Sequence, residues 1–208
     1  MLLKLFLFFR KMIKRLFDTI FSLLGTIILS PIFLVTSLLI KLGSRGPVLY
    51  KGTRVGKNEK LFEMYKFRTM VMNADKIGGP STSENDSRLT KIGKIIRKYK
   101  IDEIPQLINV LKGKMSFVGP RPEVLEEVRT YTKEEKEILS IKPGITDWAS
   151  IEFRNEGEIL KGSKNPHKTY LEKIRPEKHR LEIEYVKNHN LFIDLKILFK
   201  TILTILKG

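Results

Sequence analysis

Apolar residues form one long block near the beginning of the chain. Residues 16–40 contain a single charged side chain, that of Asp18, and the stretch 19–40 is uncharged. A straight helix over this stretch would be roughly 33 Å long, enough to cross the hydrocarbon core of a bilayer. Ser30 and Pro31 stand near its midpoint, where a proline removes one helical hydrogen bond and collides with the preceding turn. The pattern therefore predicts an apolar helix with a sharp bend at Ser30-Pro31.

The charges that flank this block bear on its topology. Lysine and arginine are retained on the cytoplasmic side of a bilayer, so basic residues at both ends place both ends on that side. We therefore expect residues 1–45 to form a re-entrant hairpin that enters and leaves by the same face. A kinked helix that crosses the bilayer is the alternative. The basic residues are Lys11, Lys14 and Arg15 before the block, and Lys41 and Arg45 after it.

Two further segments have an amphipathic pattern. In residues 191–208, Lys196, Lys200 and Lys207 fall on a narrow stripe at helical spacing, and Leu, Ile and Phe cover the rest. Such a helix lies in the plane of a membrane surface while its lysines reach the phosphate head groups. A core helix of the globular part is the alternative for this segment. Residues 1–10 are apolar with a basic fringe and are expected along the interface as well.

The region between these segments, residues 46–190, alternates between strand-like and helix-like patterns. It predicts a small α+β catalytic domain, which the hairpin precedes and the amphipathic helix follows. Strands are expected at 46–50, 61–67 and 142–148, a surface loop at 73–87, and helices at 88–99, from 102 onward and at 123–139.

The helix from residue 102 onward begins at two adjacent carboxylates. Asp102 is placed as its N-cap and Glu103 as its first residue, while Pro105 lies in the first turn, where its missing N–H costs nothing. Both carboxylates would then lie at the positive end of the helix dipole. An acidic cap is ordinary helix chemistry, so the pair alone favours a structural role. The helix itself is predicted from apolar residues at helical spacing: Ile104, Leu107, Ile108 and Leu111. Gly113 stands where a left-handed C-terminal cap would end it.

Cations around the pair point to phosphate chemistry instead. Arg97 precedes Asp102 by five residues, and Arg121 follows on a stiff Pro-Arg-Pro backbone. Arginine binds phosphate oxygens through two parallel hydrogen bonds. A carboxylate can attack phosphorus when a metal ion and arginines neutralise those oxygens. Lys66 and Arg68 lie at and just after the end of the strand at 61–67, where a solvated strand edge is the default interpretation.

The composition narrows the partners. The formal net charge is +16 and the pI about 9.9, which calls for an anionic partner such as nucleic acid, a lipid surface or phosphate substrates. The chain has no cysteine, which excludes disulfides, thiolate metal sites and cysteine nucleophiles. His167, His179 and His189 lack the spacing of a zinc site. Nucleic acid is disfavoured as the partner, because the basic residues alternate with acidic ones and the sequence contains no recognisable nucleic-acid-binding motif.

The stretch DEIPQLINVLKGKMSFVGPRP, residues 102–122, closely resembles the signature of the bacterial sugar transferases that are monotopic phosphoglycosyl transferases. Asp147 stands where the family usually has glycine, which bears on the local turn and on the nucleotide pocket. Glu182 stands where many members carry aspartate. Further matches follow in order over most of the chain: KRLFD, SP at 30–31, GPVLYKGTRVG, YKFRTM, RLTKIGKIIRK, KPGIT and EYVKNHNLFIDLKIL.

The resemblance implies an enzyme that moves a sugar-1-phosphate from a UDP-sugar to polyprenol (undecaprenyl) phosphate. Asp102 would be the nucleophile, forming a covalent aspartyl intermediate and releasing UMP. Glu103 would bind Mg²⁺, with Asp102 as the second metal ligand. The residues expected to bind substrate phosphates are Arg97, Arg121, Arg154, Lys66 and Arg68.

The resemblance also implies a location and partners. A helix broken at Ser30-Pro31 would hold a monotopic protein at the cytoplasmic face of a bacterial inner membrane. Its partners would be the UDP-sugar, the polyprenol phosphate and membrane lipids, with a homodimer left open, in the first membrane step of glycoconjugate assembly. The alternatives are a membrane-tethered glycosyltransferase, for which the chain lacks a DxD metal motif, and a basic protein that binds nucleic acid or anionic lipid.

Overall fold

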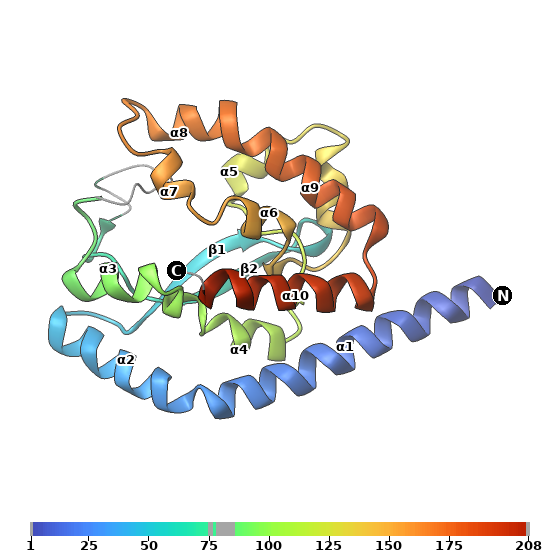
Figure 1. Cartoon of the computed structure of the whole chain (residues 1–208), viewed down its shortest axis with the longest axis horizontal. Coiled ribbons are helices and arrows are strands. Elements are labelled where there is room, and N and C mark those ends of the chain that lie inside the picture. Colours follow the sequence, from blue (N-terminus) through green and yellow to red (C-terminus); the bar gives the residue numbers. More distant parts are fainter. Residues whose placement is uncertain (1, 75–76, 78–85, 207–208) are drawn as a thin grey trace.

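The computed structural model describes residues 2–74, 77 and 86–206. Two helices, α1 (Leu2–Ile28) and α2 (Ser30–Gly43), run along one side of the molecule, and a mixed domain of helices and short strands lies above them (Figure 1). The last helix, α10 (Leu191–Leu206), lies above α1, and its Asp194 forms an ion pair with Lys14 of α1. The predicted α+β class is therefore confirmed.

The bend between α1 and α2 follows from Ser30-Pro31. Because Pro31 has no N–H, the carbonyl oxygen of Ile27 loses its helical donor. The hydroxyl of Ser30 donates to that oxygen instead at 2.8 Å, and the helix axis turns by 59°. Among the described residues, only this bent pair taken together, and neither helix alone, has the length and apolar character that crossing a membrane requires. The predicted kink is confirmed.

Three polar residues of α1 dock it onto the domain. Arg15 donates from both terminal nitrogens to the last carbonyl oxygens of α4 (Gln106–Leu111). Asp18 accepts hydrogen bonds from the hydroxyl of Ser116 and the N–H of Phe117. Lys14 forms an ion pair with buried Asp194 at 2.5 Å. Lys14 and Arg15, two of the cations expected to flank a membrane segment, therefore also hold α1 against the domain.

The first sheet is an antiparallel hairpin. Strand β1 (Leu49–Val55) pairs with β2 (Leu61–Phe67), and the register sets Leu49 opposite Phe67. The expected strand at 61–67 is confirmed, whereas the first strand begins three residues later than expected and extends to Val55. A second sheet consists of β3 (Ser116–Val118) and β4 (Gly144–Thr146), which run parallel.

The predicted helix at 123–139 is wrong. The segment contains α5 (Leu125–Val128) and a 3₁₀ helix (Glu135–Ser140), with a turn between them. Thr132 and Glu135 form a capping box across this turn: the Thr132 N–H donates to the Glu135 carboxylate at 2.7 Å, and the Glu135 N–H donates to the Thr132 hydroxyl at 3.2 Å. The box starts a new helix and therefore divides the expected one.

The other helices surround the two sheets. The helix expected at 88–99 is α3 (Lys91–Lys98), and Thr90 caps it by accepting from the N–H of Gly93. The remaining elements are a 3₁₀ turn at Lys57–Glu59, α6 (Trp148–Glu152), α7 (Glu156–Ile159), α8 (Pro166–Thr169), a π turn (Tyr170–Ile174) and α9 (Arg175–Asn188).

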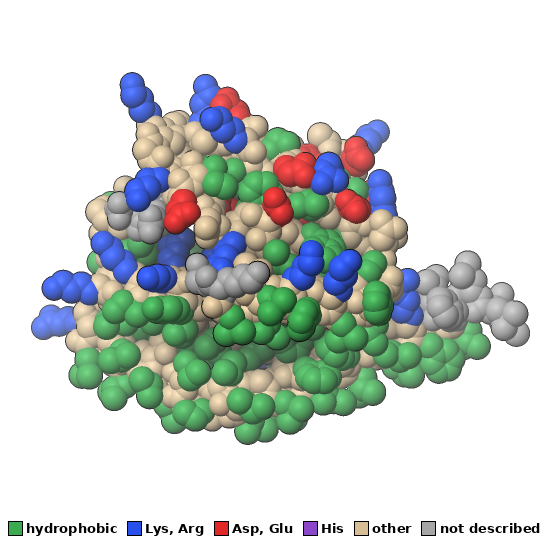
Figure 2. Space-filling view, in the orientation of Figure 1, with side chains coloured by type: hydrophobic (Ala, Val, Ile, Leu, Met, Phe, Trp, Pro, Cys, Tyr) green, Lys and Arg blue, Asp and Glu red, His purple; other side chains and the backbone are tan. Residues whose placement is uncertain are grey.

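Helix α10 combines the two alternatives considered for the C-terminal segment. One face is buried in the domain, where Asp194 is 1% and Ile197 is 0% exposed. The opposite face is apolar and exposed, with Phe192 78% and Leu206 76% exposed. Figure 2 shows hydrophobic side chains along the side formed by α1, α2 and α10, with lysines and arginines directly above them. The helix is therefore both part of the core and part of an exposed apolar face.

Candidate active site

The paired carboxylates do not begin a helix. Asp102 and Glu103 lie in a 3₁₀ turn (Ile101–Glu103), and α4 starts later, with Pro105 at its N-cap position. The prediction that Asp102 caps the helix is wrong. A cap at residue 102 needs a free N–H two or three residues on. Pro105 has none, and the N–H of Ile104 donates to the carbonyl oxygen of Ile101 at 3.1 Å.

Glu103 is held between two cations. Its Oε1 accepts a hydrogen bond from Nζ of Lys66 at 2.8 Å and from Nη2 of Arg121 at 2.7 Å. The side chain is only 13% exposed. Burial by itself raises the pKa of Glu103, but the charges of Arg121 and Lys66 outweigh it and hold the pKa well below its ordinary value. Glu103 is therefore ionised throughout the neutral range.

Asp102 has the opposite environment. It is 6% exposed, its Oδ1 is buried without a hydrogen-bond partner, and its Oδ2 lies 4.0 Å from Nζ of Lys66. Burial raises the pKa of Asp102, the charge of Lys66 opposes this shift, and the neighbouring Glu103 adds to it. Glu103 is thus held by two cations, whereas Asp102 keeps one buried oxygen without a hydrogen-bond partner.

A buried asparagine brings the elements of this site together. The side chain of Asn109 in α4 donates to the carbonyl oxygen of Glu63 at 2.6 Å and accepts from the N–H of Tyr65 at 2.9 Å. It pairs with the edge of β2 as a neighbouring strand would, and this fixes Lys66 opposite the carboxylates. Asn109 is not among the site residues predicted from the sequence. The signal was a polar residue on the buried face of an apolar helix, where an amide needs partners.

Arg121 is anchored on both sides of its backbone. Its guanidinium reaches Glu103, and its own N–H donates to the carboxylate of Glu182 at 3.1 Å. Glu182 is buried, and burial, followed by the charges of Asp147 and Glu123, raises its pKa well above the ordinary value. Glu182, at a position where many members of the family carry aspartate, therefore positions residues 119–122, which we call the arginine loop.

Asp147, which replaces the family's usual glycine, fits without backbone strain. Its φ of −158° is extended, a conformation open to any residue, and its side chain caps α6 by accepting from the N–H of Ser150 at 2.7 Å. Burial raises the pKa of Asp147. The substitution thus leaves the turn intact and adds a buried carboxyl group near Arg121.

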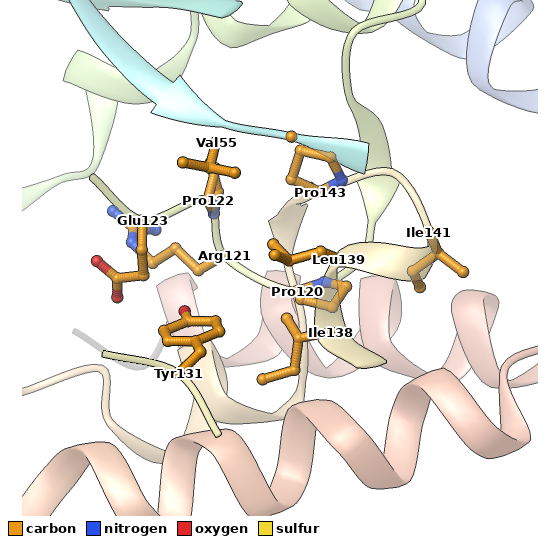
Figure 3. Close-up of a pocket in the computed structure, with 11 residues that line it drawn as sticks. Val55, Pro120, Arg121, Pro122, Glu123, Tyr131, Ile138, Leu139, Ile141 and Pro143 are labelled. Carbon is orange, nitrogen blue, oxygen red and sulfur yellow. The ribbon is translucent and has the colours of Figure 1, made fainter. Parts of the chain in front are cut away.

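A small pocket opens beside the arginine loop. Figure 3 shows Arg121 and Glu123 on one side of it, with Tyr131 and Ile138 below. Its walls also come from the end of β1 and from the segment before β4. The lining residues are Val55, Gly56, Pro120, Arg121, Pro122, Glu123, Tyr131, Ile138, Leu139, Ile141 and Pro143.

Three expected phosphate-binding residues lie outside this cluster. Arg68 is buried and donates to the carbonyl oxygens of Ser44 and Arg45, so it holds the chain that leaves α2. Arg154 donates to the carbonyl oxygen of Thr204 in α10. Arg97, in the last turn of α3, acts on Asp102 through its charge, which lowers the pKa of that carboxyl against the larger effect of burial.

The carboxylates of the site are the candidate ligands for a metal ion. Within the described ranges, no cluster of three or more His, Cys, Asp or Glu residues is arranged to hold a metal ion. Mg²⁺ in phosphate-transfer sites is commonly held by one or two carboxylates together with substrate phosphates. Asp102, with its unpartnered Oδ1, and Glu103 fit that kind of site and not an all-protein cage.

The model of a family described as "Bacterial sugar transferase" matches residues 9–208. The chain is 38% identical to a UDP-N-acetylgalactosamine-undecaprenyl-phosphate N-acetylgalactosaminephosphotransferase of Aeromonas hydrophila, over 94% of this chain and 44% of that protein. It is 39% identical to the uncharacterized sugar transferase EpsL of Bacillus subtilis, over 93% of this chain and 87% of that protein.

A third relative is the UDP-glucose:undecaprenyl-phosphate glucose-1-phosphate transferase of Escherichia coli, 36% identical over 95% of this chain and 40% of that protein. The chain thus spans less than half the length of the Aeromonas and Escherichia relatives and most of EpsL. The family match covers nearly the whole chain, including the carboxylate pair and the arginine loop. The chain belongs to the bacterial sugar transferase family.

Proposed function

We propose that the protein is a phosphoglycosyl transferase that moves a sugar-1-phosphate from a UDP-sugar to undecaprenyl phosphate and releases UMP. One observation carries the proposal: the cations that flank Glu103 stand beside an aspartate whose Oδ1 is free. The names of the Aeromonas and Escherichia relatives, both sugar phosphotransferases to undecaprenyl phosphate, support the substrate class.

In the first half-reaction, an oxygen of Asp102 attacks the β-phosphorus of the UDP-sugar. A bond forms between this oxygen and phosphorus, the bond to the bridging oxygen breaks, and UMP leaves with the electron pair. Asp102 must be deprotonated to attack. Lys66 and Arg121 are placed to receive the charge on the diphosphate oxygens.

In the second half-reaction, an oxygen of undecaprenyl phosphate attacks the same phosphorus. The acyl phosphate bond breaks, the carboxylate of Asp102 is restored, and the product is an undecaprenyl diphosphate sugar. Mg²⁺ held by Glu103 and Asp102 would neutralise the diphosphate oxygens during transfer. Arg97 contributes positive charge from α3 without a direct contact to the carboxylates in the described chain.

The proposed location is the cytoplasmic face of a bacterial inner membrane, with α1 and α2 as a re-entrant hairpin. Support comes from the exposed apolar side chains of these helices, such as Ile28, Leu34 and Leu42. Arg15 links α1 directly to α4, the helix that follows Asp102. This link would hold the carboxylates near the depth of the lipid phosphates, so the prenyl chain stays in the bilayer.

The test is a search for the covalent intermediate. Full-length protein is incubated with a panel of UDP-sugars and Mg²⁺, without undecaprenyl phosphate, and examined by intact-mass spectrometry. We expect a sugar-phosphate adduct with an accepted donor, one UMP per adduct, and loss of the adduct when undecaprenyl phosphate is added. Asp102→Asn is the control that cannot form it. Product formation with no adduct at any time would contradict the two-step reaction.

A further inference from the structure

Two lysines of α10 share the ring of the only tryptophan in the chain. Nζ of Lys196 lies 5.9 Å and Nζ of Lys200 lies 5.1 Å from the ring centre of Trp148, the first residue of α6. The lysines are one helical turn apart and both are exposed. A tryptophan ring attracts one cation readily, but two ammonium groups at one ring repel each other.

This pair of charges is not neutralised within the described part of the chain, where neither lysine has a carboxylate within 4.0 Å. The acid on the same helix, Asp194, is buried and pairs with Lys14. Other exposed cations of the domain do have acidic neighbours, such as Lys168 beside Glu172. An anion between the two ammonium groups would therefore relieve their repulsion.

The position of the cluster indicates which anion this is. The two lysines border the exposed apolar face of α10, and Figure 2 shows basic side chains directly above the apolar band. Phosphates of a bilayer lie at that height above acyl chains, where tryptophan and lysine side chains concentrate. The exposed apolar residues of this face are Phe192, Leu195, Phe199, Ile202, Leu203 and Leu206.

We propose that Trp148, Lys196 and Lys200 form a docking site for the phosphate of an anionic phospholipid of the bilayer. The proposal rests on the membrane attachment proposed above and adds a lipid preference to it. The occupant is a structural lipid of the membrane and not the acceptor. The site would fix the height and tilt of α10, and through the Lys14–Asp194 ion pair also the position of α1.

Vesicle binding tests the charge requirement. Full-length protein is mixed with vesicles of phosphatidylcholine alone, or of an equimolar mixture with phosphatidylglycerol, and the bound fraction is measured by flotation. We expect Lys196→Gln/Lys200→Gln to lower the partition onto the mixed vesicles by about 30-fold, since each lysine near an anionic surface contributes about 1 kcal/mol. Binding to neutral vesicles should be unchanged. Added salt should weaken only the part of the binding that depends on phosphatidylglycerol.

The matched control is Lys164→Gln/Lys168→Gln, which removes the same charge from exposed positions at α8, on the side away from α1 and α2 (Figure 1). Its partition should fall far less. If both double variants lost the same amount of binding to the mixed vesicles, the proposal would be overturned. The preference for anionic lipid would then follow from the net positive charge of the protein and not from this site. Equal binding of the unmodified protein to both kinds of vesicle would overturn it as well.

Trp148 provides a readout at the site itself, since it is the only tryptophan. Its fluorescence should change between neutral and phosphatidylglycerol-containing vesicles, and the change should disappear in Lys196→Gln/Lys200→Gln. An equal response to undecaprenyl phosphate in neutral vesicles would assign the site to the acceptor and overturn the commitment to a structural lipid. UMP release by unmodified protein in detergent tests the catalytic proposal separately, so the two failures are distinguishable.

Discussion

Nη1 of Arg15 donates to the carbonyl oxygen of Val110 at 2.6 Å, and 95 residues separate the two. Nη2 donates to Leu111 at 2.8 Å, so one side chain of α1 satisfies two carbonyls at the end of α4. The charge also complements the negative end of the short helix. Helix α1, which forms part of the exposed apolar face, is therefore bonded to α4, the helix that follows Asp102 and Glu103.

Loss of the hydrogen bonds from Arg15 should make α4 and the neighbouring carboxylates more mobile. In Arg15→Gln we expect about a 10-fold lower rate of UMP release, because two carbonyls at the end of α4 lose a charged donor worth about 1.5–3 kcal/mol. Hydrogen exchange of the amides in residues 106–111 should accelerate. Lys11→Gln, an exposed position on the same helix, removes the same charge and is the control. Unchanged exchange in Arg15→Gln would contradict the coupling.

Replacing Asp102, the proposed nucleophile, should separate activity from stability. Asp102→Asn should lower UMP release by at least about 10³-fold, because an amide cannot form the acyl phosphate. The same change should raise Tm near neutral pH by about 3 °C, since ionising a buried carboxyl costs folding free energy.

The pH dependence follows from the raised pKa of Asp102, which burial causes. A group with a raised pKa contributes stability below its unfolded pKa and loses it as pH rises through the folded value. The Tm advantage of Asp102→Asn should therefore shrink on acidification, and thermal unfolding at a series of pH values measures it. Adduct formation by the unmodified protein should fall as pH drops through the pKa of Asp102. An advantage of Asp102→Asn that grew in acid would refute this assignment.

The two cations at Glu103 should matter more for catalysis than other surface cations. Lys66→Gln and Arg121→Gln should each reduce the rate of adduct formation by about 10²-fold, since each removes a positive charge that we propose stabilises the diphosphate oxygens. Either change should also raise the pKa of Glu103, which Arg121 and Lys66 now depress against burial. Single-turnover kinetics give the rate. Arg129→Gln, exposed on the domain surface, should behave like the unmodified protein.

Pro31 should be required for the bend. In Pro31→Ala the residue regains an N–H for the carbonyl oxygen of Ile27, so α1 and α2 can continue as one straight helix. We expect part of the population to place its N-terminus on the periplasmic side. The chain has no cysteine, so one cysteine introduced near the N-terminus can be labelled without background. Identical labelling with and without Pro31 would show that the bend does not depend on it.

The sequence alone determined the features that depend on neighbouring residues. Ser30-Pro31 specified the kink, alternation specified the strand at 61–67, and Gly113 adopts the expected left-handed conformation with a φ of +71°. The signature around Asp102 identified the family. Each of these features depends on local backbone chemistry or on a contiguous motif, so it can be predicted without knowledge of the tertiary contacts.

Only the tertiary structure decided which side chains meet. Lys66 reaches Glu103 across 37 residues, whereas Arg68, two positions further on and just past the end of β2, is buried against the chain that leaves α2. The alternation of a strand shows that two such residues share a face, but not what lies opposite each of them. That depends on packing at a distance, here on Asn109 against the edge of β2 and on Arg15 at the end of α4.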